Sequence, residues 1–130
     1  MPDQFLHVRF RVADIDRSVE YYVKHLGFEA KSVSPKGSTS SPAGNRLAFL
    51  ELPGNDFALE FCESDYKPEV PEDLIHTCIG VPDLIAYCDR LEKEGLEIWP
   101  DGWREQFVDG RKMAFVTDPD GYEVELVERK

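Results

Sequence analysis

The chain has 130 residues, of which 42% are hydrophobic and 32% are charged, and its formal net charge is −11 at pH 7. These values are typical of a single folded domain with one core and argue against intrinsic disorder. A strongly acidic surface repels phosphate backbones and anionic lipid, and no apolar run approaches the roughly 20 residues of a membrane span, so we expect neither nucleic-acid nor membrane partners.

The first half of the chain predicts a strand, a helix and three further strands. Residues 5–12 alternate strictly between apolar and polar side chains, which is the period of a half-buried strand. Asp14 is placed to cap a helix over 15–26, and Gly27 follows where a helix commonly ends in left-handed backbone. The remaining predicted elements are strands near 28–34, 46–52 and 56–63, a loop at 34–44 and a turn at 53–55.

The same order is predicted again after a polar connector at 64–73. Residues 74–81 alternate like the opening strand, and Pro82-Asp83 opens a helix to about Glu94 that Gly95 ends. The remaining predicted elements are a strand near 96–99, a loop at 100–110, strands at 112–118 and 122–128, and a turn at 119–121.

Overlaying the two halves indicates an internal repeat. His7, Val12 and Asp14 fall on His76, Val81 and Asp83 at a common offset of 69, and a slightly smaller offset puts Glu60 against Glu125. Internal repetition of a βαβββ unit is the simplest account. We therefore predict one α+β domain over 1–130, built from module 1 (about 4–63), a linker (64–73) and module 2 (about 74–128).

Four side chains on the polar strand faces point to a metal centre. Each half offers one histidine from its first strand and one glutamate from its last, namely His7, Glu60, His76 and Glu125. If the sheets curl into a cup, these nitrogen and oxygen donors can converge on a borderline divalent ion such as Ni²⁺, Co²⁺, Zn²⁺ or Mn²⁺. Open positions on that ion would mark a catalytic site. The alternative is that the four are ordinary solvated side chains.

The three cysteines, Cys62, Cys78 and Cys88, are odd in number and form no CxxC pair. The N-terminus lacks a basic flank followed by an apolar stretch, so we expect no signal peptide and a cytoplasmic location with reduced thiols. Cys62 and Cys78 lie on the strand faces of Glu60 and His76, and we interpret them as small buried thiols.

Four segments together resemble the signature blocks of glyoxalase I (lactoylglutathione lyase), in the vicinal-oxygen-chelate superfamily. They are HVRFRVADIDRSVEYYVKHLGF, LAFLELPGNDFALEF, LIHTCIGVPDL and MAFVTDPDGYEVELVE. The resemblance implies the glyoxalase/bleomycin-resistance/dioxygenase fold, in which two βαβββ modules form a cupped, barrel-like sheet. It also implies one divalent metal per site, bound by His7, Glu60, His76 and Glu125. The short length resembles bacterial members that prefer Ni²⁺ or Co²⁺, with Zn²⁺ as the alternative.

The resemblance further implies a lyase or isomerase reaction on a small molecule. A 2-oxoaldehyde and a thiol, classically methylglyoxal and glutathione, combine as a hemithioacetal that becomes a 2-hydroxyacyl thioester through a metal-stabilised enediolate. Glu125 is expected to be the main base, with Glu60 as its counterpart for the opposite enantiomer. Short members of the family resemble homodimers with sites between subunits, so we expect a homodimer.

Substrate contacts follow the family pattern only in part. Arg11 aligns with a family arginine that pairs with a glutathione carboxylate, and Ser64 replaces a family asparagine. The segment 103–112 replaces glycine-rich contacts, and there Trp103, Arg104, Arg111 and Lys112 could form an anion-binding flap or simply a solvated loop. Another thiol than glutathione therefore stays open.

Two other functions remain as alternatives. An acyl-CoA epimerase would use the same enolate chemistry, but that branch usually carries glutamine at the position of Glu60. A binding or resistance protein would sequester a small molecule without turnover, but it has no need of two metal-bound carboxylates.

Overall fold

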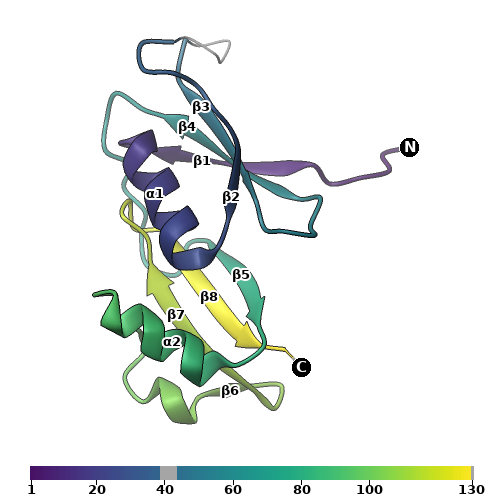
Figure 1. The fold of residues 1–130 in the computed structure, drawn as a ribbon, viewed down its shortest axis with the longest axis vertical. Helices are drawn as coiled ribbons and strands as arrows, with labels where there is room; N and C mark the ends of the chain where they lie inside the picture. Colours follow the sequence, from purple (N-terminus) through teal and green to yellow (C-terminus); the bar gives the residue numbers. More distant parts are fainter. Residues whose placement is uncertain (39–43, 130) are drawn as a thin grey trace. The chain divides into compact units, whose positions relative to one another are not determined.

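The computed structural model describes residues 1–38 and 44–129, and the chain divides into two compact units, 1–69 and 70–130 (Figure 1). The centre of the loop predicted at 34–44 lies outside the described residues. Each unit contains one helix and one mixed four-stranded sheet, so the predicted α+β class with two βαβββ modules is confirmed. We refer to them as the N-terminal unit and the C-terminal unit.

The N-terminal unit follows the predicted order of elements closely. It consists of β1 (His7–Val12), α1 (Ile15–Leu26), β2 (Glu29–Val33), β3 (Leu47–Glu51) and β4 (Ala58–Glu63). The strand order in the sheet is β1-β4-β3-β2, with β1 parallel to β4 and the other neighbours antiparallel. The first and last strands of the unit are therefore adjacent, which brings the side chains of β1 beside those of β4.

The C-terminal unit repeats this topology. It consists of β5 (His76–Val81), α2 (Leu84–Lys93), the short 3-10 helix η1 (Trp103–Glu105), β6 (Phe107–Val108), β7 (Arg111–Thr117) and β8 (Glu123–Glu128). The strand order is β5-β8-β7-β6, and β5 is again parallel to the last strand. The same connectivity in both units supports the internal repeat that the sequence predicts.

The third element of the second repeat differs from its prediction. Residues 96–99 form no strand, and Trp99 makes only a single bridge with Phe115 of β7. The edge strand is β6, which lies with η1 inside the segment predicted as a loop. Trp103 is buried, and the guanidinium of Arg104 lies 4.3 Å from its ring centroid and 2.5 Å from Asp89 of α2. These contacts pack Trp103 into its own unit, so the interpretation as a solvated loop is wrong for Trp103, whereas Arg104 is exposed and paired with Asp89.

Each helix is anchored at its N-terminus to the last strand of its own unit. Asp14 accepts hydrogen bonds from the first turn of α1, and Glu63 at the end of β4 accepts one from the Ile15 amide at 3.0 Å. Asp83 caps α2 in the same way, and Glu128 of β8 accepts from the Leu84 amide at 3.1 Å. Carboxylates satisfy amides that a helix start leaves unpaired, and so fix how each helix meets its sheet.

The apolar strand faces pack against the helices, mostly as predicted. The buried apolar side chains of the strands include Phe10, Val12, Leu50, Leu59, Phe61, Ile79, Val81, Met113, Val116, Val124 and Leu126. Three apolar side chains within the predicted strands 5–12 and 56–63 and the predicted helix 15–26 are exposed, namely Leu6, Phe57 and Val23. Leu6 and Phe57 precede the paired parts of their strands. Strand β4 is buried on both faces, so the residues between its core positions are not on a solvated surface.

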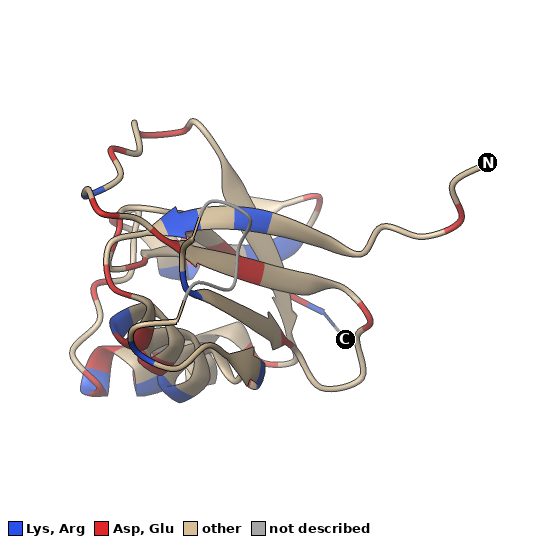
Figure 2. Cartoon of the chain, turned by 90° about the horizontal axis from the view of Figure 1, so that it is seen from above, with Lys and Arg blue, Asp and Glu red and all other residues tan. Residues whose placement is uncertain are grey.

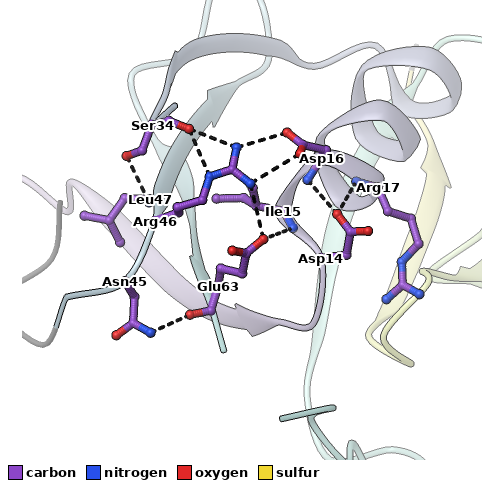
Figure 3. A network of polar contacts seen from close by, with 9 residues as sticks. All are labelled: Asp14, Ile15, Asp16, Arg17, Ser34, Asn45, Arg46, Leu47 and Glu63. Atoms are coloured by element: carbon purple, nitrogen blue, oxygen red, sulfur yellow. Dashed lines mark hydrogen bonds and ion pairs between the residues drawn. The ribbon is translucent and has the colours of Figure 1, made fainter. Parts of the chain in front are cut away.

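A buried arginine joins three elements of the N-terminal unit (Figure 3). Arg46 precedes β3, and its guanidinium donates to the Ser34 carbonyl at 2.9 and 3.1 Å. It also pairs with Asp16 of α1 at 3.1 Å and with Glu63 of β4 at 3.4 Å. Glu63 also accepts a hydrogen bond from the Ile15 amide, so one network connects the start of α1 to the end of β4 and to the residue before β3.

Replacing Arg46 with methionine should lower the free energy of unfolding by about 1–2 kcal/mol, because the Ser34 carbonyl loses charged donors that methionine cannot supply. Urea unfolding followed by circular dichroism measures this. The matched control is Lys31→Met, which removes an exposed pair with Glu29 and should change the unfolding midpoint little. Equal midpoints for wild type and the Arg46 variant would contradict a structural role for the network.

Charged positions are spread over the helices, strands and loops of both units, as Figure 2 shows in red and blue. In the described ranges 1–38 and 44–129, none of the helices is long and apolar enough to cross a membrane.

Candidate metal-binding site

The first predicted pair forms at the junction of β1 and β4. In the parallel register His7 lies opposite Ala58 and Arg9 opposite Glu60, so all three polar side chains share the face away from α1. His7 Nε2 lies 3.9 Å from Glu60 Oε2. The imidazole is 42% exposed while the Glu60 side chain is 6% exposed. Glu60 is therefore a buried carboxylate, and the alternative of an ordinary solvated side chain does not hold for it.

The second predicted pair forms at the equivalent junction of β5 and β8. His76 Nε2 lies 3.0 Å from Glu125 Oε1, and here too the imidazole is the exposed partner while the carboxylate is 13% exposed. Two donors that each lie about 2.1 Å from one ion, at right angles, are about 3 Å apart. The His76–Glu125 pair thus has the spacing of two adjacent ligands.

Each histidine also contacts a phenylalanine that sequence reasoning missed. Phe49 of β3 lies opposite Glu60, and its ring meets the His7 ring edge-on, with centroids 5.5 Å apart. Phe115 of β7 lies opposite Glu125 and meets His76 in the same way at 5.7 Å. Such aromatic contacts fix the plane of each imidazole. The alternation of strands β3 and β7 was the available signal, since it places these rings on the side of the glutamates.

The structure adds a cation to the first pair that the prediction did not include. Arg9 Nε donates to Glu60 Oε1, and this hydrogen bond is the main reason that the pKa of the Arg9 guanidinium is raised. Glu60 thus has Arg9 at one oxygen and His7 near the other. Its negative charge is already compensated within its own unit.

Cys78 occupies the corresponding position in the second pair, opposite Glu125. It is exposed, so the prediction of a buried thiol is wrong for it, whereas Cys62 and Cys88 are buried. Partial desolvation of the sulfur, and then the neighbouring Glu125 carboxylate, raise the pKa of the Cys78 thiol. Burial raises the pKa of the Cys88 thiol to about 12. Both groups are therefore neutral thiols near pH 7.

Two predicted substrate residues contact each other. Arg11 Nε donates to Ser64 Oγ at 2.9 Å, and Arg11 Nη1 lies 3.1 Å from Cys62 Sγ. Arg11 shares the strand face of His7 and Arg9. Ser64 is buried and its amide donates to the Val12 carbonyl, so the contact holds Arg11 beside the end of β4.

The other two predicted substrate residues belong to the C-terminal unit, where their strand pairs with β6. Arg111 and Lys112 begin β7 and pair with Val108 and Phe107 of β6. Arg111 is exposed, and Lys112 is half-buried. The structure therefore places them on a short hairpin of the C-terminal unit.

The turn before β8 positions Glu125. The buried carboxylate of Asp118 accepts hydrogen bonds from the amides of Asp120 and Tyr122, both at 2.9 Å. Gly121 completes the turn with φ +99°, a conformation that favours glycine. The turn formed by the segment DPDGY thus sets where β8 begins and on which face of the sheet the Glu125 side chain lies.

The donor chemistry fits a divalent ion. Each unit presents one imidazole nitrogen and one carboxylate, a combination that suits Ni²⁺, Co²⁺ or Zn²⁺. Within the described residues, no group of three or more His, Cys, Asp or Glu side chains is placed to hold an ion. The structure therefore brings together His7 with Glu60 and His76 with Glu125, and their union around one ion is a proposal.

Comparison with known proteins agrees with this fold. Residues 4–126 match the Glyoxalase/Bleomycin resistance protein/Dioxygenase superfamily. A lactoylglutathione lyase from Haemophilus influenzae is 33% identical over 98% of this chain and 93% of its own length. The trypanothione-dependent glyoxalase I of Leishmania major is similar in structure, with a TM-score of 0.73, 27% identity, and coverage of 98% of this chain and 87% of that one. An antibiotic binding protein from Streptomyces shares the fold at a TM-score of 0.77 and 20% identity, covering 99% and 98% of the two chains.

Proposed function

The chain belongs to the Glyoxalase/Bleomycin resistance protein/Dioxygenase superfamily, and we propose that it is a metal-dependent lyase of the glyoxalase I type. The observation that carries the proposal is the repeated His–Glu pair, His7 with Glu60 and His76 with Glu125, on equivalent strands of both units. The similarity to lactoylglutathione lyases over nearly the whole chain supports it.

In the proposed reaction the substrate is the hemithioacetal of a 2-oxoaldehyde and a thiol. A divalent ion held by His7, Glu60, His76 and Glu125 would act as a Lewis acid toward the substrate's neighbouring oxygens. Glu125 removes the proton from C1 and returns it to C2, which yields the 2-hydroxyacyl thioester without net oxidation. His76 and Glu125 lie side by side as neighbouring donors for this ion, and Phe115 contacts the imidazole edge-on.

The surroundings of the two glutamates favour Glu125 as the main base. One carboxylate oxygen of Glu60 accepts a hydrogen bond from the Arg9 guanidinium, so that oxygen is not available to a substrate while the bond is made. Among the described residues, the polar neighbours of Glu125 are His76 and Cys78, and no lysine or arginine pairs with it. Glu60 then serves as a ligand and as the base for the opposite enantiomer.

We assign Arg11, held by Ser64, to the carboxylate of a thiol such as glutathione, and Arg111 and Lys112 to a second anionic group. The protein acts in the cytoplasm as a homodimer in which each site takes a His–Glu pair from each subunit. Ni²⁺ or Co²⁺ is the expected metal, with Zn²⁺ as the alternative.

Two measurements test the proposal. Purified protein should contain about one divalent ion per chain by elemental analysis. Methylglyoxal with glutathione should give thioester absorbance in the ultraviolet, which a chelator abolishes and added Ni²⁺ or Zn²⁺ restores. A metal-loaded protein without thioester formation would instead favour an acyl-CoA epimerase or another substrate. A protein that binds no metal would overturn the proposal and favour a non-catalytic binder.

A further inference from the structure

Arg9 differs from the other charged residues near the two His–Glu pairs because it already hydrogen-bonds a proposed metal ligand. It lies on β1 directly opposite Glu60 and hydrogen-bonds Oε1 of that carboxylate. The Glu60 side chain is 6% exposed, whereas that of Arg9 is 42% exposed. The carboxylate is therefore fixed in the protein, and the guanidinium has room to leave it for solvent.

The second repeat provides an internal comparison. Cys78 stands where Arg9 stands in the first, opposite the glutamate in a parallel pair of strands. The Arg9 guanidinium hydrogen-bonds the Glu60 carboxylate, whereas the residue opposite Glu125 is a cysteine, which brings no cation to that carboxylate. The two repeats therefore present unequal half-sites, because a guanidinium pairs with Glu60 whereas, among the described residues, none pairs with Glu125.

We propose that Arg9 is an internal competitor for the metal, so that a divalent ion binds Glu60 only by displacing the Arg9 guanidinium. This inference rests on the proposed function, because it requires Glu60 to be a metal ligand. The displaced guanidinium also repels the arriving ion, since two positive charges then lie near one carboxylate. Arg9 thus lowers the affinity of the four-ligand site for the ion through Glu60, and no equivalent competition arises at Glu125.

The test compares metal affinities rather than rates. Apoprotein is titrated with Ni²⁺ and with Zn²⁺ against a chromogenic chelator for wild type, Arg9→Met and Arg104→Met. The control matches because Arg104 is also a partly exposed arginine paired with a carboxylate, but in η1 and α2. Arg9→Met should bind about 10-fold more tightly than wild type, and Arg104→Met should equal wild type.

A reciprocal variant keeps the inference falsifiable if Arg9→Met folds poorly. Cys78 is exposed, so Cys78→Arg introduces the competing cation beside Glu125 without filling a core. It should weaken metal binding about 10-fold. If wild type binds metal and Arg9→Met binds no more tightly, the competitor role is wrong while the proposed function stands. If wild type, Arg9→Met and Cys78→Arg all fail to bind metal, the metal site itself is refuted.

Discussion

Replacing Glu125 with glutamine should lower the kcat of thioester formation by about 1000-fold at saturating metal. A positioned general base contributes about 100- to 10,000-fold, and glutamine keeps the size of the side chain while losing the ability to accept the substrate proton. The amide oxygen can still lie beside His76, which is 3.0 Å from the carboxylate in the structure. Steady-state rates at several metal concentrations separate this loss from weaker metal binding.

The matched control for this variant lies two residues earlier on the same strand. Glu123 of β8 has its side chain on the same face as Glu125, is buried, and accepts a hydrogen bond from the Asp73 amide at 3.1 Å. A glutamine at 123 can accept the same bond through its amide oxygen, so Glu123→Gln should react near the wild-type rate. A Glu125→Gln protein that binds metal normally and turns over like wild type would show that the base is another residue.

The alternation of residues along the strands predicted much of the fold. Period two placed Phe10 and Val12 in the core and His7 on the opposite face, because a strand with one buried face leaves that mark in the sequence. The capping residues were equally informative. Asp14 accepts hydrogen bonds from amides in the first turn of α1, and Gly27 ends the helix in left-handed backbone with φ +75°. Each of these predictions depends on neighbours within a few residues of one another.

The parts that could not be predicted depend on contacts between distant segments. Alternation puts Arg9 on the face of His7, but only the parallel register of β1 with β4 places it opposite Glu60, 51 residues away. The strand expected at 96–99 failed for a similar reason. Trp103 packs into the core and Arg104 reaches Asp89 of α2, so the edge strand forms later, at β6. Local propensity carries no information about such contacts.

Because each unit carries one His–Glu pair, subunit complementation should reveal whether a complete site is shared between chains. One chain carries His7→Ala with Glu60→Gln, and a second carries His76→Ala with Glu125→Gln. Each homodimer has only incomplete sites and should be inactive. If sites form between subunits, a mixed dimer unites the intact first pair of one chain with the intact second pair of the other, and regains one of its two sites.

Random mixing makes about half of the dimers mixed, so co-refolded chains should recover about a quarter of the wild-type activity. The same fraction should hold for bound metal, which checks the result without relying on turnover. A site formed within one chain gives a different result, since every chain then carries one broken pair and mixing restores nothing. Zero recovery from chains shown to exchange subunits would place the four ligands within a single subunit.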